Sequence, residues 1–309
     1  MLPTRQGSIR LFRFAGIDLY LHWSWFLVAF YGISTRAPSY SSYVWPVLDY
    51  LTLFLIVLIH EFGHALACRQ VGGKADQIVL WPLGGVAYVA PPQRPGAMLW
   101  SIAAGPLVNL ILAPFLTILA VVTGNSGLAD TMPNAAVFVR DICIINFALL
   151  IFNLLPIYPL DGGQILRSVL WFFLGRARSL MVAAVIGFVG VGGLIIFAVL
   201  KFQVWLGILC AFILLNCWRG LMQARALARI ASLPRRPGFQ CPECKQAPVL
   251  GPVWRCARCL KAFDTFETHA VCPHCGAEFA VTRCFDCGAA HPLAEWVVPP
   301  PIPSAVDAP

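Results

Sequence analysis

Charged residues are scarce in this sequence. Only 12% of the 309 residues are Asp, Glu, Lys or Arg, which is about half the proportion found in soluble globular proteins. Hydrophobic residues make up 59% of the chain, and the mean hydropathy is +0.76. This composition excludes a soluble globular protein and predicts an α-helical polytopic membrane protein embedded in a lipid bilayer.

Acidic residues are the scarcer charge type, with 14 Asp and Glu against 22 Lys and Arg. A net charge of +8 can attract nucleic acid. Basic residues clustered in short loops beside membrane spans explain that charge more simply, so we expect no nucleic-acid partner. With both termini on one side, only Arg36, Arg140 and Lys201 remain on the other. The charge bias therefore predicts that both termini are cytoplasmic. We also expect the protein to lie in the inner membrane of the cell.

The sequence also lacks the pattern of a cleavable signal peptide. Its first apolar run is rich in Trp, has no small-residue cleavage site and is followed by further spans. We count this run, about 22–35, as the first of six transmembrane helices, although it is short for a bilayer and must be extended by its flanks. His22, beside Trp23, is expected at the membrane interface rather than on a metal. The other spans are expected at about 47–69, 97–123, 136–155, 179–200 and 203–218, with a separate helix at about 164–175.

Two segments outside these spans favour extended structure. Residues 1–21 alternate weakly between apolar and polar types and predict a short strand or an interfacial segment. Between residues 73 and 89, glycines that include Gly84 and Gly85 punctuate β-prone residues, which indicates a hairpin or a re-entrant loop. An ordinary cytoplasmic loop is the alternative. An unpaired edge of such a hairpin could bind an extended peptide by β-strand addition.

The sequence His60-Glu61-Phe62-Gly63-His64 lies near the end of the second span. Residues four apart on a helix share one face, so His60 and His64 can bind one metal ion while Glu61 reaches a water molecule beside it. The preceding residues, 47–59, are nearly all apolar. Ionisable groups inside a membrane span are costly and usually functional, which favours a metal site over a pair of structural histidines.

A second polar feature interrupts the fourth span. Two prolines and two glycines between Asn153 and Gly163 end a helix and leave an irregular segment that carries Asp161. The expected orientation places Asp161 and the histidine pair near the cytoplasmic ends of their spans, at similar depth. Asn153 could bind a substrate backbone or a developing oxyanion, or it could cap the broken helix.

Eight of the 12 cysteines form four Cys-x-x-Cys pairs after residue 240. The pairs supply thiolates for two structural zinc sites. Disulfides are the alternative, but a cytoplasmic tail is kept reduced. The spacing leaves open whether consecutive pairs combine or cross over. Because the tail has few apolar residues, we expect zinc to supply most of its folding energy. The cysteines are Cys241, Cys244, Cys256, Cys259, Cys272, Cys275, Cys284 and Cys287.

The chain is therefore expected to have four regions. A membrane domain covers residues 1–218, and a basic helix with a linker covers 219–240. A double zinc-ribbon-like domain follows at 241–297, and the Pro-rich end, 298–309, is expected to be disordered.

Three separated motifs, HEFGH, AGPLVN and NLLPIYPLDGG, occur in this order on three expected spans. Together they resemble the site-2 protease family of intramembrane zinc metalloproteases, over about residues 10–218. The resemblance implies that His60, His64 and Asp161 bind zinc and that Glu61 is the catalytic acid and base. It also implies a membrane-associated β-hairpin at 73–89 and an active site toward the cytoplasm. The PDZ or CBS domain of many members is missing, and the cysteine-rich tail takes its place.

Four residues are expected to contact substrate. Asn109 and Asn153 match asparagines in the motifs of the family, although Asn109 could simply bond a neighbouring helix. Gly84 and Gly85 belong to the expected hairpin. The expected cofactors are one catalytic Zn²⁺ and two structural Zn²⁺, and the oligomeric state is left open.

The expected function is hydrolysis of a peptide bond within or near the transmembrane segment of a single-span membrane protein. Zinc held by three protein ligands keeps a fourth position for water, and Glu61 would take a proton from that water. One alternative is a non-proteolytic scaffold of the same fold, which would have no need of Glu61. Another is a metal transporter with a zinc-sensing tail, which would need a second ligand set across the membrane.

Overall fold

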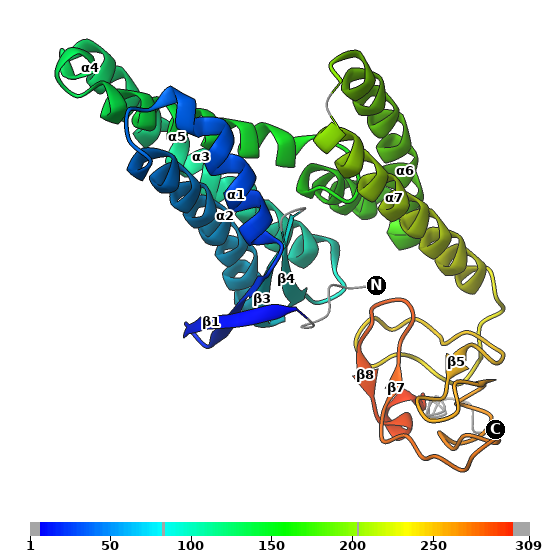
Figure 1. Cartoon of the computed structure of the whole chain (residues 1–309). Helices are drawn as coiled ribbons and strands as arrows, with labels where there is room; N and C mark the ends of the chain where they lie inside the picture. The colour runs from blue at the N-terminus through cyan, green and yellow to red at the C-terminus, as the bar shows by residue number, and fades with distance from the viewer. Residues whose placement is uncertain (1–6, 82–83, 203, 299–309) are drawn as a thin grey trace, which may run out of the picture.

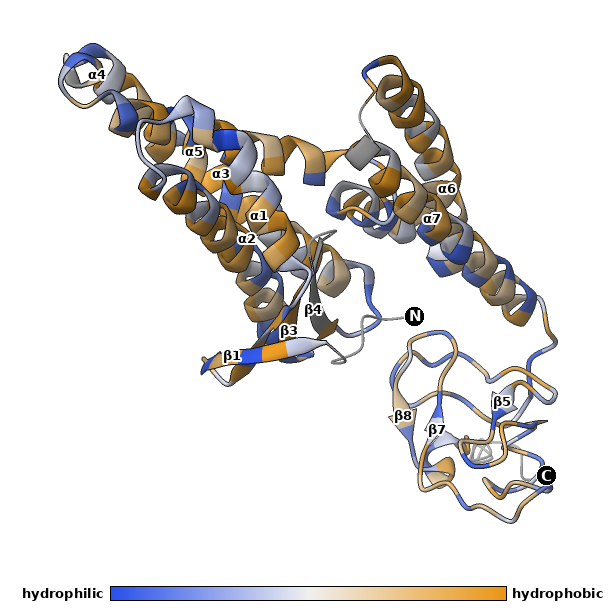
Figure 2. Ribbon diagram, viewed as in Figure 1, coloured by the Kyte–Doolittle hydropathy of each residue, from blue (hydrophilic) through white to orange (hydrophobic). Residues whose placement is uncertain are grey.

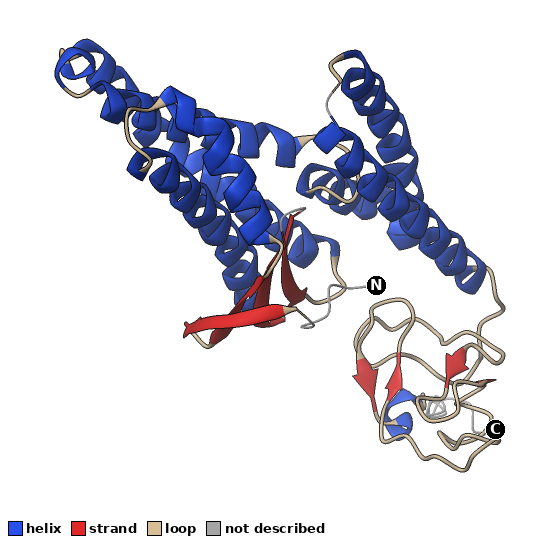
Figure 3. Cartoon of the chain, in the orientation of Figure 1, coloured by secondary structure: helices blue, strands red, loops and turns tan. Residues whose placement is uncertain are grey.

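A computed structural model describes residues 7–81, 84–202 and 204–298 of the chain (Figure 1). Long helices dominate it. A small sheet lies at one end of the first helices, and a compact loop-rich domain follows the last helix (Figure 3). The expected disordered segment, 298–309, lies outside the described residues apart from Val298.

The sheet has four strands in the order β1-β2-β3-β4. The strands are β1 (Ser8–Phe14), β2 (Ile17–His22), β3 (Lys74–Trp81) and β4 (Gly84–Ala90). The outer pairs are antiparallel, whereas β2 and β3 run parallel, from Asp18 opposite Gln77 to Leu21 opposite Leu80. The segment expected as a hairpin is therefore part of a larger sheet, with β4 at its edge. Residues 82–83, between β3 and β4, lie outside the described residues.

The sheet packs against α2 (Val44–Gln70). Alternate residues of a strand point to one face, and Ile17 and Leu19 of β2 join Ile78 and Leu80 of β3 in a fully buried cluster. The cluster includes Ala65 and Cys68 from the last two turns of α2. The sheet thus holds the half of α2 that carries HEFGH.

Five helices are long and apolar enough to cross a membrane among the described residues, where six crossings were expected. They are α2, α3 (Pro95–Asn125), α5 (Pro133–Leu154), α6 (Asp161–Leu200) and α7 (Val204–Ala231). The expected first span contains α1 (Trp25–Arg36), whose 12 residues rise only about 18 Å, against about 30 Å for the apolar part of a bilayer. Two single-turn elements, η1 (Ala37–Ser39) and α4 (Leu128–Thr131), complete this part.

Two helices differ in length from the expectation. The basic segment after residue 219 continues the last span as one helix, α7, instead of forming a separate surface helix. Helix α6 is interrupted at Gly175, whose φ of 75° and ψ of 173° are not helical and suit glycine alone. The break separates a short first segment from a long second one, close to the expected helices at 164–175 and 179–200.

Hydrophobic residues predominate along the long helices (Figure 2), and many of their large apolar side chains are exposed. Phe115 on α3 is 67% exposed and Val189 on α6 is 75% exposed. Such surfaces in a helical bundle are typical of contact with lipid.

The C-terminal domain is held by four short strands and by aromatic packing. The strands pair as β5 (Trp254–Arg255) with β6 (Ala262–Phe263) and β7 (Thr282–Arg283) with β8 (Ala290–His291), and η2 (Leu293–Trp296) follows. The rings of Trp254 and Trp296 pack edge-on against Phe266 at centroid distances of 5.4 and 5.2 Å. The domain therefore has an aromatic core that the low count of apolar residues did not predict.

Candidate metal centre

Three side chains from two helices converge inside the membrane part. His60 and His64 lie one turn apart on α2, and their Nε2 atoms are 3.1 Å apart. The first residue of α6 supplies Asp161, whose Oδ2 lies 3.1 Å from Nε2 of His60 and 3.3 Å from Nε2 of His64. Both histidines are buried, with 5% and 6% of their surface exposed. The structure thus brings together the three residues that were expected to bind the metal.

The spacing of these atoms fits a zinc ion. Bonds of about 2.0–2.1 Å in a tetrahedral site separate neighbouring ligand atoms by about 3.3–3.5 Å. The three observed separations are 3.1 to 3.3 Å. Two imidazoles and one carboxylate are also a donor set that zinc accepts when it keeps a fourth position open.

The ring of His60 is oriented by two buried asparagines. Nδ1 of His60 lies 2.6 Å from Oδ1 of Asn109, which is an acceptor, so this nitrogen carries the proton. The amide of Asn109 is fixed in turn, because its Nδ2 donates to Oδ1 of Asn146 at 2.9 Å. Asn146 on α5 donates back to the backbone carbonyl of Asn109 at 3.0 Å. The chain of bonds leaves Nε2 of His60 unprotonated and facing the metal position.

The ring of His64 is oriented by the backbone of α3. Its Nδ1 lies 2.9 Å from the carbonyl oxygen of Ser101, which can only accept a hydrogen bond. Both histidines therefore present Nε2 to the same point, and α3 sets both rings through different groups.

Glycines allow α3 to approach α2 this closely. A methyl group at Gly63 would lie 2.8 Å from the carbonyl oxygen of Ala104. A methyl group at Gly105 would lie 2.7 Å from Nε2 of His60 and closer still to the ring of His64. Since zinc would lie about 2 Å from the same nitrogen atoms, Gly105 leaves open the space that the ion needs.

The segment before Asp161 is packed tightly between helices. Gly162 and Gly163, in the first turn of α6, lie against the backbone of residues 154–158 with no room for a side chain. Gly187 on the second half of α6 also lies against Tyr158, and the carbonyl of Tyr158 accepts a hydrogen bond from Sγ of Cys217 at 2.7 Å. Contacts from α6 and α7 thus fix the position of the third ligand.

The remaining expected site residues are distributed differently. Glu61 is 6% exposed and follows His60 on α2. Asn109 is fully buried, and its amide oxygen and nitrogen bond His60 and Asn146 on the neighbouring helix α5. Asn153 is half-buried in the last turn of α5. Gly84 and Gly85 lie on the edge strand β4.

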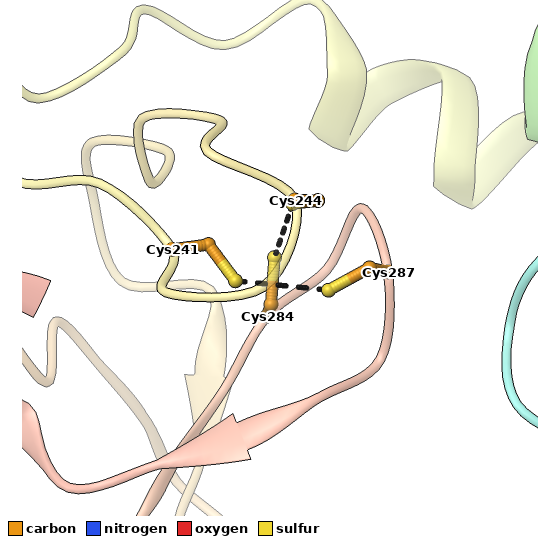
Figure 4. A group of neighbouring side chains, drawn as sticks. All are labelled: Cys241, Cys244, Cys284 and Cys287. Carbon is orange, nitrogen blue, oxygen red and sulfur yellow. Dashed lines mark hydrogen bonds between the residues drawn. The ribbon is translucent and has the colours of Figure 1, made fainter. Parts of the chain in front are cut away.

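The tail cysteines form two clusters with nested pairing. The first and last Cys-x-x-Cys pairs make an outer cluster of Cys241, Cys244, Cys284 and Cys287 (Figure 4). The middle pairs make an inner cluster of Cys256, Cys259, Cys272 and Cys275. The sequence left open whether consecutive pairs combine or cross over, and the structure shows neither, because the outer pairs enclose the middle pairs.

The sulfur separations in these clusters fit metal sites and do not fit disulfides. Opposed Sγ atoms lie 3.7 and 3.8 Å apart in the outer cluster and 3.6 and 3.7 Å apart in the inner cluster. Tetrahedral zinc with bonds of about 2.3 Å requires about 3.8 Å, whereas a disulfide requires about 2.05 Å. Backbone N–H groups of Arg258 and Cys259 point at Sγ of Cys256, at 3.3 and 3.4 Å. These donors, the Cys259 N–H first, lower the pKa of Cys256 to about 6 and favour the thiolate that binds metal.

Comparison with known proteins shows what the membrane part is similar to. The model of peptidase family M50 matches residues 50–142 and 134–197. The membrane part is similar to peptidase family M50. A solved site-2 protease from Methanocaldococcus jannaschii superposes with a TM-score of 0.50 at 27% identity, covering 69% of this chain and 95% of that chain.

Two curated relatives extend this similarity. A zinc metalloprotease of Methanocaldococcus jannaschii is 37% identical over 182 residues, which are 58% of this chain and 50% of that protein. Stage IV sporulation protein FB of Bacillus subtilis is 34% identical over 124 residues, which are 38% of each chain. The chain thus spans half or less of the length of these relatives. The M50-like part contains all three ligands of the membrane site, and the similarity is consistent with an intramembrane zinc metalloprotease.

Three residues of the M50-like site were not singled out from the sequence. Ser101 acts through its backbone, which no side-chain pattern reveals. Gly105 is part of the AGPLVN motif, but its role depends on how closely α3 approaches α2. Asn146 did carry a signal, because an amide within the apolar run of α5 is costly unless it is bonded.

Replacing Gly105 with alanine should remove zinc from the membrane site. The added methyl group would overlap the space between the two imidazoles, so the zinc content of the full-length protein should fall from about three ions per chain to about two. Elemental analysis of the purified protein measures this. Gly124→Ala, on the same helix with no atom within 4 Å of the new methyl group, is the matched control and should retain all the zinc.

Pairs of cysteine substitutions should reveal the nested arrangement by zinc counting. Cys241→Ser with Cys287→Ser removes two ligands of one cluster, so about one ion per chain should be lost. Cys241→Ser with Cys275→Ser damages both clusters and should lose about two. Equal losses from the two double variants would contradict the pairing.

Proposed function

We propose that this protein is an intramembrane zinc metalloprotease that hydrolyses a peptide bond within or near the transmembrane segment of a single-span membrane protein. The observation that carries the proposal is the set of His60, His64 and Asp161 donor atoms, 3.1 to 3.3 Å apart and buried among membrane helices. Glu61, on the turn that carries both histidines, supplies the acid–base group that hydrolysis requires.

Each residue has a separate task in this proposal. His60, His64 and Asp161 hold zinc, which when bound polarises a carbonyl and makes water acidic near neutral pH. Glu61 accepts the proton of the attacking water and passes it to the leaving amine. Asn109 and Ser101 keep both imidazoles in the tautomer that binds metal, and Asn153 donates a hydrogen bond to the substrate backbone.

A transmembrane substrate is helical and must unwind before its carbonyl can be attacked. We propose that β4 binds the unwound stretch as a fifth strand of the sheet. β4 lies at the edge of the sheet beyond β3 and contacts α2. Gly84 and Gly85 on this strand present backbone groups without bulky side chains, which suits a peptide of varied sequence.

We also propose six crossings with both termini in the cytoplasm. The sheet lies beside the C-terminal end of α2, and the tail domain follows α7 at the same end of the bundle (Figure 1). If the sheet and the tail domain lie on one side, the chain between them crosses the membrane an even number of times. The five long helices supply five crossings, so α1 with its flanks must supply the sixth. Arg36 at the end of α1 supports this, because it bonds Asp141 near the start of α5 at 2.6 Å. Membrane association of the β3–β4 hairpin and an inner-membrane location belong to the same proposal.

The two alternative functions gain no support from the structure. A metal transporter would need a second set of ligands across the membrane. Among the described residues the only such set in the membrane part is the one that contains His60. A non-proteolytic scaffold would leave Glu61 without a task beside an assembled zinc site.

Replacing Glu61 with glutamine should abolish proteolysis while zinc is retained. The change removes a proton acceptor but no ligand, so hydrolysis of a single-span substrate should fall by about 10²- to 10⁴-fold. Purified protein in lipid nanodiscs, assayed by gel for the cleaved product, measures this. Zinc content equal to that of the unmodified chain is the control, and turnover near the original rate would contradict the proposed mechanism.

Replacing Asp161 with alanine should lower both zinc content and hydrolysis. One of three protein ligands is lost, so the membrane site should empty while the two tail clusters keep their metal. The content should therefore fall to about two ions per chain. Asp130→Ala, an exposed acidic residue of α4, is the control. Retention of all the zinc by Asp161→Ala would show that this carboxylate is not a ligand.

A further inference from the structure

The two clusters of the tail differ in what they touch. Glu243, between Cys241 and Cys244 of the outer cluster, forms an ion pair with Arg94. The backbone carbonyl of Phe285, between Cys284 and Cys287, accepts a hydrogen bond from Nη1 of Arg176 at 3.0 Å. Among the hydrogen bonds and ion pairs of the described residues, none joins the Cys-x-x-Cys loops of the inner cluster to the membrane part. The outer cluster is therefore the side of the tail that contacts the membrane part.

The partners of the outer cluster lie next to α3, which packs against the membrane site, and on α6, which supplies one of its three residues. Arg94 directly precedes α3. This helix contacts both imidazoles, through hydrogen bonds at Ser101 and Asn109 and through close packing at Gly105. Arg176 directly follows the break of α6 at Gly175, and the same helix begins with Asp161. Gly288, just after the outer cluster, packs against Gln93, where an added methyl group would lie 2.8 Å from Cγ.

Zinc in the outer cluster would join these two attachments directly. The loop that contacts Arg94 and the loop that contacts Arg176 are separated by about forty residues of chain, and their thiols meet at the outer cluster (Figure 4). Arg235 adds a second link, because it bonds Asp286 of one loop and the carbonyl oxygen of Ala247 just after the other. An emptied cluster loses the link through zinc, because no metal–sulfur bonds then join the two loops. Arg94 and Glu243 are 66% and 42% exposed, so their ion pair is weak and can be broken.

We propose that the outer four-thiolate cluster is a regulatory zinc site that latches the start of α3 to the break of α6. With zinc bound, the latch restrains the separation of these helices and limits access of a transmembrane segment to the membrane site. With zinc lost, the latch opens. The three ligands of the membrane site stay assembled, because they are held by their own contacts at Gly63, Gly105 and Gly162. The consequence for cleavage rests on the proposed protease function, whereas the latch itself does not.

Charge reversal tests the latch without touching a cysteine. In full-length protein in nanodiscs, Arg94→Glu should repel Glu243 and raise amide hydrogen exchange in residues 93–101 and 172–180. We expect about a two- to five-fold increase, as loss of one exposed ion pair predicts. Glu243→Arg combined with Arg94→Glu restores opposite charges and should restore the exchange rates. Zinc content must stay at that of the unmodified chain in each variant.

A second pair of variants tests the role of zinc. Cys284→Ser with Cys287→Ser empties the outer cluster and should reproduce the increased exchange of Arg94→Glu in the same two segments. Cys272→Ser with Cys275→Ser empties the inner cluster and is the matched control, which should leave exchange at 93–101 unchanged. The rate of cleavage of a single-span substrate should rise several-fold in Arg94→Glu. It should return to the rate of the unmodified chain when Glu243→Arg is added.

Unchanged exchange at 93–101 and 172–180 in Arg94→Glu, with all zinc retained, would overturn the latch. The latch would also be overturned if the charge swap failed to reverse the increased exchange. The same holds if emptying the inner cluster increased exchange by an equal amount. If exchange responds as expected but no variant, nor the unmodified chain, cleaves any substrate, the latch stands and the proposed protease function fails.

Discussion

The close approach of α3 to α2 is the contact on which the membrane site depends. It requires the absence of a side chain at Gly63 and at Gly105, where any larger residue would meet backbone atoms or the imidazoles themselves. This contact places Ser101 and Asn109 at Nδ1 of His64 and His60, on the side of each ring away from the metal position. The sheet fixes the other face of α2 through the cluster around Ile78. The histidines are therefore held between two rigid elements.

The polar groups of this site are nearly all bonded to one another, which is what an apolar surrounding demands. An unpaired amide buried in protein costs about 1–3 kcal/mol, so two isolated asparagines would destabilise the bundle. Here Asn109 and Asn146 bond each other and the ring of His60. Loss of such an outer partner typically weakens metal binding about 10- to 100-fold, or about 1.4–2.7 kcal/mol. The same bonds thus serve stability and metal affinity.

Local patterns in the sequence predicted the groups that carry the chemistry. The four-residue spacing of His60 and His64, the helix break at Asp161 and the cysteine pairs all express constraints between nearby residues. The structure places the three ligands together and gathers the cysteines in two clusters of four. The long spans were also found, because an apolar run of that length has few other meanings.

Features that depend on contacts between distant residues were missed. The parallel pairing of β2 with β3 joins residues about sixty positions apart, so no hairpin pattern marks it. The nested cysteine pairing and the role of Asn109 depend likewise on which segments meet in space. The aromatic core of the tail was overlooked because three well-placed rings matter more than the number of apolar residues.

The central claim is that one zinc ion lies among His60, His64 and Asp161 and that the tail holds two more. Anomalous X-ray scattering at the zinc absorption edge, from crystals of the full-length protein, tests it most directly. Three zinc peaks per chain are expected, one at about 2 Å from both Nε2 atoms and the Asp161 carboxylate, and one inside each four-cysteine cluster. Peaks confined to the tail, in a preparation that still cleaves a membrane substrate, would contradict it.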